Sequence, residues 1–146
     1  MTGEFSIAVH ALVFLNHHQS DILSSEALAE NVCTNPARIR KVMAKLKKAG
    51  LVKTKSGSEG GYYFDLDPFS VNLRLICEAI GGRVVSTSWR SGDSEMDCLI
   101  ASGMADIMDE IFMSLDAAGK KELEKTTVGD IDLKIFGSQK ITGEKQ

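Results

Sequence analysis

Positively charged side chains are concentrated in one short segment of an otherwise acidic chain. Between residues 33 and 61 the sequence contains eight Lys or Arg residues and a single acidic residue, Glu59. The whole chain of 146 residues has a formal charge of −3, so the residues outside this segment carry −10. Because the charges are segregated rather than mixed, the segment is predicted to bind a polyanion.

Three cysteines are the other residues that could do chemistry. Cys33, Cys77 and Cys98 are odd in number and widely spaced, which argues against the disulfide framework of a secreted protein. Cys33 is expected in the turn before a basic helix. The free N–H groups at the start of that helix and the charge of Arg38 favour a thiolate. Cys77 falls at an apolar helical position and is most simply a buried small side chain.

A helix is predicted to position the positive charges. Asn35-Pro36 marks its start, because Pro is favoured at the first helical position and Thr34 or Asn35 can cap the free amides, and Gly50 supplies its stop. One face is apolar at helical spacing: Ile39, Val42, Met43 and Leu46. The opposite face alternates small and cationic side chains: Ala37, Lys41, Ala44 and Lys48, flanked by Arg38, Arg40, Lys45 and Lys47. Small side chains let a helix enter a DNA groove, and cations meet the phosphates beside it.

Neighbouring elements complete a winged helix-turn-helix. An apolar stripe predicts a helix over residues 5–16, and Ser24 caps a second, short helix that ends at the Cys33-Thr34 turn. After the basic helix, residues 51–55 and 62–65 are expected to form two strands joined by a glycine-rich turn. A short helix, a turn, a basic helix and a ribbon are typical of this DNA-binding motif.

Residues 24–64 resemble the winged-helix domain of the Rrf2 family of bacterial transcription regulators, and the resemblance covers roughly residues 1–135. The residues that carry it are the Thr34-Asn35-Pro36 turn, Arg40 after Ile39, the Ala-Gly-Leu-Val exit at 49–52 and the double glycine in the wing at 57–62. It implies a homodimer on a partly palindromic DNA operator, with Asn35, Ala37 and Arg40 facing the bases and the wing near the minor groove. The predicted DNA-binding residues are Thr34, Asn35, Ala37, Arg38, Arg40, Lys41, Lys45, Lys55, Ser58 and Gly60.

The second half of the chain reads as a frame for dimerisation. Ser70 is expected to cap a helix that Gly81-Gly82 ends, and Val84-Val85 to be a short extended piece. A broad apolar stripe over residues 95–116, close to a heptad repeat, predicts a long helix with more apolar surface than one small domain can bury. We therefore predict a DNA-binding domain over 1–85, and a dimerisation helix with a C-terminal arm or short strand (126–133) over 86–135. Residues 136–146 are expected to be a disordered tail.

The family resemblance also frames the cysteine chemistry. Many members hold an iron–sulfur cluster through three cysteines at the start of the long helix and in the loop before it, whereas this chain has only Cys98 there. We therefore predict no cofactor and no metal site. The resemblance places that region near the DNA-binding domain of the partner subunit, so a Cys33–Cys98 bridge between subunits is the expected redox switch. The alternative is that both are ordinary thiols, with Cys33 half buried under the turn.

These features predict a mainly α protein with a small β-wing: a dimeric, sequence-specific DNA-binding regulator, acting as a repressor. No apolar run approaches the ~20 residues needed to span a membrane, and the N-terminus lacks a basic signal region, so a cytoplasmic location is expected. One alternative is a winged-helix module that binds an acidic protein and never contacts DNA; another is an iron–sulfur-dependent regulator. An enzyme is excluded because no nucleophile or phosphate-loop motif is present.

Overall fold

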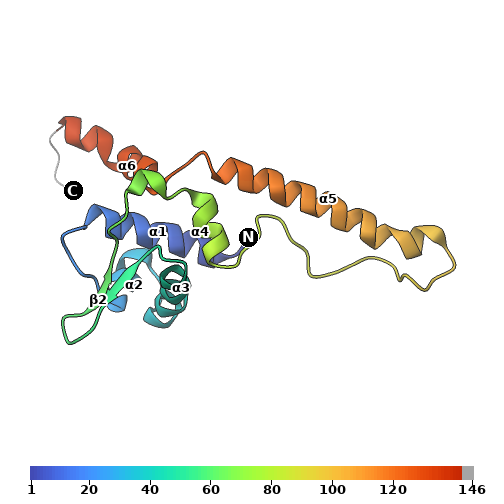
Figure 1. The fold of residues 1–146 in the computed structure, drawn as a ribbon, viewed down its shortest axis with the longest axis horizontal. Coiled ribbons are helices and arrows are strands. Elements are labelled where there is room, and N and C mark those ends of the chain that lie inside the picture. Colours follow the sequence, from blue (N-terminus) through green and yellow to red (C-terminus); the bar gives the residue numbers. More distant parts are fainter. Residues whose placement is uncertain (143–146) are drawn as a thin grey trace.

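The computed structural model describes residues 1–142 and confirms a mainly helical chain with a small antiparallel sheet. Its elements, in order, are α1 (Gly3–His17), α2 (Ser25–Val32), α3 (Pro36–Lys48), β1 (Lys53–Lys55), β2 (Gly61–Tyr63), the 3₁₀ turn η1 (Pro68–Ser70), α4 (Leu73–Ala79), α5 (Leu99–Leu123) and α6 (Val128–Thr142). Helices α1 to α4, the sheet and α6 gather into one body, and α5 extends away from it (Figure 1). Within the described residues, no helix is long and apolar enough to cross a membrane.

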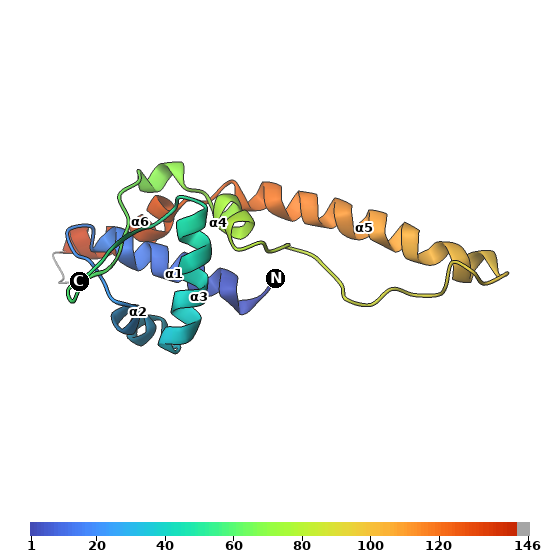
Figure 2. The ribbon, with the colours of Figure 1, turned by 60° about the horizontal axis from the view of Figure 1, so that its bottom comes forward.

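The first three helices form the predicted helix-turn-helix around a shared core. Ser24 caps α2 by accepting a hydrogen bond from the Ala27 N–H at 3.1 Å. The Asn35 side chain caps α3 by accepting one from the Arg38 N–H at 2.9 Å. The apolar faces predicted for α1 and α3 are buried: Ile7, Ala8, Ala11, Leu12 and Leu15 on α1, and Ile39, Val42, Met43 and Leu46 on α3. Figure 2 shows α3 crossing α1, with α2 beside both helices. Burial of one face leaves the other face of α3 outward.

The wing is a shorter ribbon than the sequence predicted. β1 pairs with β2 through Lys53↔Tyr63, Thr54↔Tyr62 and Lys55↔Gly61. The segment before α2 also pairs with β2, because Leu23 and Tyr62 exchange backbone hydrogen bonds of 2.8 and 2.9 Å. Gly61 permits this close approach, since a Cβ there would collide with the Leu23 carbonyl. The wing is therefore anchored to the segment that leads into α2.

Helix α4 begins at a different residue from the one expected. Asn72 caps it, with its side chain accepting from the Leu75 N–H at 2.9 Å, whereas Ser70 ends the 3₁₀ turn η1 and donates its hydroxyl to the Asp67 carbonyl. Asn72 is two residues nearer the buried apolar residues of α4, so the cap follows the core rather than the first polar residue after Pro68. Gly81, at φ +72°, stops the helix as predicted.

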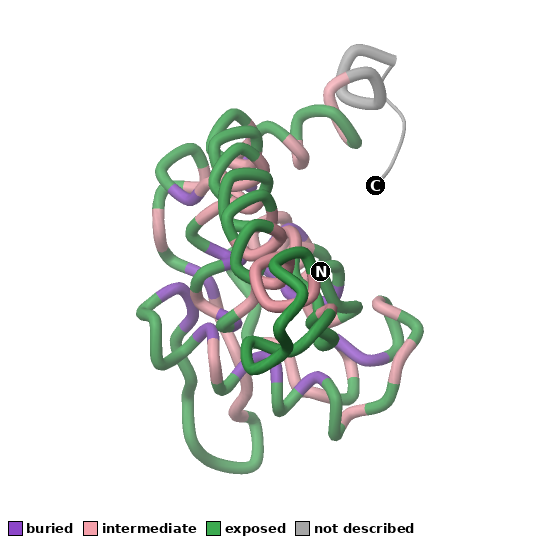
Figure 3. The backbone as a smooth tube through the Cα atoms, turned by 90° about the vertical axis from the view of Figure 1, so that its right-hand side faces the viewer, coloured by how far each residue is buried: buried purple, intermediate pink, exposed green. Residues whose placement is uncertain are grey.

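Helix α5 is the long helix that the apolar stripe predicted, with shifted ends. It starts at Leu99, with Cys98 at its N-cap, and continues to Leu123 instead of stopping at residue 116. None of its residues is buried in the single chain, and Figure 3 shows it exposed or half-exposed along its length. Val84 and Val85 before it do not join a sheet, because both backbone N–H groups donate to the Asp116 carboxylate, at 2.7 and 3.1 Å.

The expected arm or strand at residues 126–133 is wrong for residues 128–133, because α6 occupies them, while Thr127 before the helix forms an isolated antiparallel bridge with Asn72. Thr127 and Asp130 form a reciprocal capping box: the Asp130 N–H donates to the Thr127 hydroxyl at 3.0 Å, and the Thr127 N–H donates to the Asp130 carboxylate at 2.9 Å. α6 packs back onto α1 rather than extending from α5. Residues 136–142 of the expected disordered tail are helical, and residues 143–146 lie outside the described part of the chain.

Candidate nucleic-acid interface

The outward face of α3 carries the small and cationic side chains in the predicted alternation. Ala37, Lys41, Ala44 and Lys48 are exposed, as are Arg38, Arg40 and Lys47 beside them. The four apolar residues on the opposite face are at most 1% exposed, so α3 is fixed on the body with this face toward solvent. Among the described residues, neither Lys47 nor Lys48 takes part in an ion pair, and both belong to the outward face predicted for this helix although they were not among the predicted DNA-binding residues. The sequence feature that could have added them to the DNA-binding residues is their position in the last turns of α3.

The N-terminal end of α3 is held by hydrogen bonds to the turn and to α2. The Thr34 N–H donates to the Ala29 carbonyl at 3.0 Å, which closes the turn. The Arg40 guanidinium donates to the Ser25 hydroxyl at 3.2 Å and lies 3.9 Å from the Glu26 carboxylate. Both groups of the latter pair are more than half exposed, so the pair is weak and Arg40 can exchange it for a phosphate or a base edge. Ser25 therefore orients Arg40 without sequestering it.

Two lysines one turn apart on α3 have different surroundings. The Lys45 ammonium lies 3.1 Å from the Glu4 carboxylate and 3.5 Å from the Ile80 carbonyl, and its side chain is 35% exposed. The Lys41 ammonium is 4.0 Å from Glu4 and its side chain is 69% exposed. The structure thus separates a lysine that ties α3 to α1 and the end of α4 from one that is available to a ligand.

The wing adds one exposed cation near its tip. Lys53 is paired with Asp65 at 2.7 Å, and the hydrogen bond from this carboxylate raises the pKa of Lys53. Lys55 and Ser58 are exposed at the turn. Gly60 acts through shape, because a Cβ there would collide with the Lys55 carbonyl. The predicted wing residues Lys55, Ser58 and Gly60 are therefore brought together at one tip.

Comparisons with known proteins identify the family to which this fold belongs. A family model described as the Rrf2 iron-dependent transcriptional regulator matches residues 1–132. The chain belongs to the Rrf2 family. It is 24% identical over 136 residues to YwnA of Bacillus subtilis, covering 93% of this chain and 99% of that protein. It is 23% identical over 143 residues to IscR of Vibrio vulnificus, covering 91% and 84%. Both relatives are named as HTH-type transcriptional regulators.

A solved structure of a transcriptional regulator from Lactobacillus plantarum superposes with a TM-score of 0.83 at 25% identity, covering 98% of this chain and 96% of the other. The match extends over almost the whole chain, so it includes α5 and α6 as well as the winged helix. The protein is accordingly a DNA-binding transcriptional regulator of the Rrf2 family, and not an enzyme.

The residues present do not fit the iron that the family description implies. Cys33 is exposed in the turn before α3, Cys77 is buried in α4, and Cys98 is exposed at the start of α5, so the three thiols lie on separate elements. In the described part of the chain, no group of three His, Cys, Asp or Glu side chains converges as metal ligands would. We therefore derive no step of the regulatory mechanism from a metal.

The three thiols have different environments. Burial raises the pKa of Cys77, whose Sγ donates to the Gly82 carbonyl at 3.6 Å. Backbone N–H groups of Ala101 and then Ile100 lower the pKa of Cys98 at the helix N-terminus. Cys33 is exposed rather than half buried, and it has the left-handed backbone conformation, with φ +63°. The chemically available thiols are therefore Cys33 and Cys98.

Proposed function

We propose that this Rrf2-family protein is a homodimeric, sequence-specific repressor that inserts α3 into the major groove of a partly palindromic operator. The observation that carries the proposal is the outward face of α3. Its centre is small, at Ala37 and Ala44, and its flanks are cationic, while the opposite face is locked into the core. Small central residues allow groove entry, and flanking cations contact phosphates. Arg40 and Asn35 are assigned to base edges, and Lys55 and Ser58 at the wing tip to the minor-groove side.

The dimer proposal rests on α5. Large apolar side chains along this helix are exposed in the single chain: Leu99 is 86% exposed, Ile100 70%, Ile107 55%, Leu115 50% and Ile111 46%. Contiguous exposed apolar surface of this kind is typical of a protein interface. A second α5 packed against it would form a symmetric dimer, in which two α3 helices face two half-sites of one operator.

A redox switch between Cys33 and Cys98 is a further part of the proposal. α5 starts at its end farthest from the body (Figure 1), so a bridge between these thiols has to join two subunits. With a peroxide as oxidant, the two thiols lose two protons and two electrons to form the disulfide, and the peroxide is reduced to two molecules of water. Two observations support the choice of thiols: the lowered pKa of Cys98, and the left-handed backbone conformation of Cys33, which ordinarily favours glycine.

DNA binding is tested by recovering operator fragments from sheared genomic DNA with the purified protein and measuring their affinity in a gel-shift titration. We expect one dimer per fragment, a two-fold footprint, and affinity that falls steeply with salt because bound cations release counterions from phosphate. An acidic protein partner recovered in place of DNA, with no shifted fragment, would establish the protein-interaction alternative and refute the proposal.

The redox part is tested separately, in wild type and in Cys33→Ser. Peroxide should release wild-type protein from the operator and produce a covalent dimer on a non-reducing gel, and Cys33→Ser should do neither. Equal release from both proteins would refute the switch while leaving the DNA-binding proposal intact. Cys77→Ala serves as the control, because Cys77 is buried and should not affect the response.

A further inference from the structure

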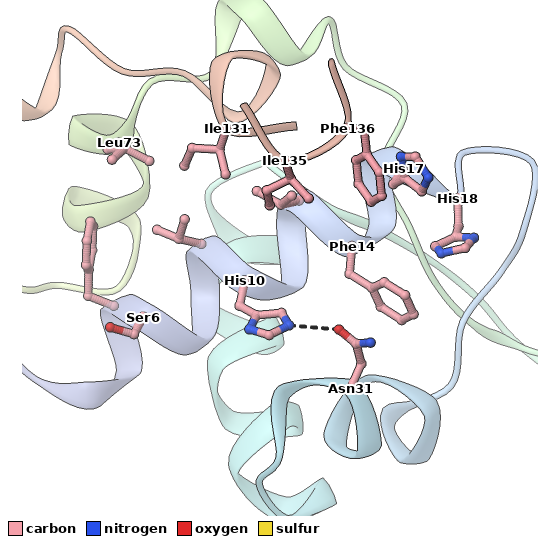
Figure 4. Close-up of a pocket in the computed structure, with 13 residues that line it drawn as sticks. Ser6, His10, Phe14, His17, His18, Asn31, Leu73, Ile131, Ile135 and Phe136 are labelled. Carbon is pink, nitrogen blue, oxygen red and sulfur yellow. Dashed lines mark hydrogen bonds between the residues drawn. The ribbon is translucent and has the colours of Figure 1, made fainter. Parts of the chain in front are cut away.

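A large cavity lies on the side of α1 that faces away from the core. It has a volume of about 810 Å³, is partly open to solvent, and is lined by α1, Asn31 of α2, the start of α4, and α6. Figure 4 shows Ile131, Ile135 and Phe136 of α6 on one side of it, and His10 and Asn31 on the other. Ligand sites in proteins commonly have volumes of roughly 300–1,000 Å³. The cavity is separate from the outward face of α3.

The sequence of α1 explains why the cavity exists. An ordinary surface helix buries one face and exposes a polar one, whereas α1 is apolar on two faces. Its first face packs into the core, and its second presents Phe5, Val9, Val13 and Phe14 to the cavity. α6 covers this second face only in part. Its apolar residues therefore form walls around a space instead of a close-packed contact.

The cavity walls are held in place by polar contacts at one end. Asp132 of α6 accepts a hydrogen bond from the Asn16 side chain at 2.7 Å and lies 3.3 Å from Nδ1 of His17. The His17 ring stacks on Phe136, with 3.7 Å between the ring centroids and 13° between the planes. These contacts join α1 to α6, so the cavity is preformed rather than an opening between loosely associated helices.

The chemistry of the lining indicates which ligands fit. Phenylalanine and histidine rings and aliphatic side chains make up most of the surface, and within the described residues no Lys, Arg, Asp or Glu lines it. Ser6, His17 and His18 also line it, and at its edge Nε2 of His10 and the Asn31 side-chain oxygen form a hydrogen-bonded pair 2.8 Å apart. Burying a charged ligand group here would be costly, whereas flat aromatic surface and one hydrogen-bonding group would be accommodated.

We propose that this cavity binds a small, neutral, largely aromatic molecule that hydrogen-bonds to His10 or Asn31, and that occupancy weakens operator binding. The effect of the ligand on operator binding rests on the proposed function. Asn31 lies in the last turn of α2, two residues before Cys33 and the turn into α3. A ligand that takes the place of the His10–Asn31 hydrogen bond removes a link between α1 and α2, and α2 in turn orients Arg40 through Ser25. The ligand thus acts on the position of the DNA-reading helix.

The binding half is tested by fluorescence titration of the full chain with N-phenyl-1-naphthylamine, a neutral probe in which one N–H donor joins a naphthalene and a phenyl ring and which brightens in apolar sites. At pH 8 we expect saturable binding of one probe per chain. The related anionic probe 8-anilino-1-naphthalenesulfonate should bind at least about tenfold more weakly, because its sulfonate finds no cation in the lining. Tighter binding of the anionic probe would refute the proposed ligand class.

Two variants locate the site, and one controls for them. Ile135→Trp places an indole in the cavity and should weaken the neutral probe at least about tenfold; Ser6→Trp fills it from α1 and should do the same, as a check against a folding defect in either variant. Leu133→Trp is the matched control, because Leu133 is 51% exposed against 48% for Ile135, lies on the same helix and does not line the cavity. Probe binding that neither cavity variant affects overturns the assignment.

A second copy of the chain is the other candidate occupant, and protein concentration distinguishes it. If a partner segment fills the cavity in the dimer, the apparent affinity for the probe falls as the protein concentration rises, and the small-molecule assignment is wrong. A constant affinity supports it.

The coupling half is tested by repeating the operator titration with saturating N-phenyl-1-naphthylamine. We expect operator affinity to fall about fivefold or more, and operator DNA to weaken the probe by the same factor, because coupling between sites is reciprocal. Unchanged operator affinity refutes the coupling. If no operator is bound at all, the proposed function fails, while the fluorescence titration still decides the ligand site.

Discussion

Two lysines on α3 allow a quantitative test of the docking face. Lys41→Gln removes a cation that is 69% exposed and has only a distant carboxylate, at 4.0 Å, whereas Lys45→Gln removes one that is 35% exposed and hydrogen-bonded to Glu4 at 3.1 Å. Each phosphate contact contributes about 0.9 to the slope of log affinity against log salt concentration. A dimer carries each substitution twice, so Lys41→Gln should reduce the slope by about 1.8.

The slope difference also predicts how the loss of operator affinity in Lys41→Gln depends on salt concentration. Between roughly 50 and 200 mM salt, a slope difference of about 1.8 narrows the affinity gap between wild type and Lys41→Gln about twelvefold. Lys45→Gln should leave the slope unchanged and instead lower the free energy of unfolding by roughly 0.5–1 kcal/mol, the usual range for a partly exposed ion pair.

The assay is fluorescence anisotropy of a labelled operator fragment across a salt series, with chemical denaturation run on the same proteins. Lys121→Gln is the control for loss of charge, because Lys121 is exposed on α5, away from α3. An equal slope reduction for Lys41→Gln and Lys45→Gln would show that the ion pair with Glu4 opens on DNA and that the structural distinction between the two lysines is wrong. An unchanged slope for Lys41→Gln would refute the docking face itself.

Three further predictions concern stability and thiol chemistry. Thr127→Ala and Asp130→Ala should each lower the free energy of unfolding by about 1 kcal/mol, and together by less than the sum, because each caps the other in the box that starts α6; urea titrations of the two single variants and the double variant measure this. Cys33→Gly should raise the free energy of unfolding by roughly 0.5–1 kcal/mol, since glycine adopts φ +63° without the steric cost of a side chain, and a loss of stability in the same titration would contradict the strained conformation. Ellman's reagent should modify Cys33 and Cys98 in the native protein and Cys77 only after unfolding. In a Cys33→Ser background, alkylation of Cys98 should stay fast at pH values where an ordinary thiol has slowed, because the lowered pKa keeps Cys98 a thiolate. A pH–rate profile with the midpoint of a free cysteine would contradict this.

Much of the DNA-reading unit was predictable because its signals are local. Capping by Ser24 and Asn35, the four buried positions of α3 and the stop at Gly50 each depend on residues within one or two helical turns. The long α5 was predictable for the same reason, since a stripe of apolar residues defines a helix regardless of what covers it. Its ends were misplaced, from residue 95 to Leu99 at the start and from residue 116 to Leu123 at the end, because the helix continues past the last apolar residue of the stripe.

The segment at residues 126–133 shows how local signals can compete. Thr126, Thr127 and Val128 are β-branched and favour an extended chain, and Gly129 weakens a helix. The capping box between Thr127 and Asp130 and the packing of α6 against α1 outweigh this preference. Only the first of these is visible in the sequence, as the Thr-Val-Gly-Asp pattern, and the second depends on where α1 lies.

The amino-acid sequence alone therefore determined the type of protein. It encodes a charged helix with its caps, a wing and a long apolar helix, because each of these depends on short-range periodicity and capping. The tertiary structure decided how residues of the same type differ in their surroundings and therefore in what they can bind. Lys45 is committed to Glu4, 41 positions away, while Lys41 is available, and the second apolar face of α1 lines a cavity because α6, more than 110 residues later, covers it incompletely. The physical reason is range: helix periodicity and capping act over a few residues, but ion pairs and cavities depend on distances that only the folded chain sets.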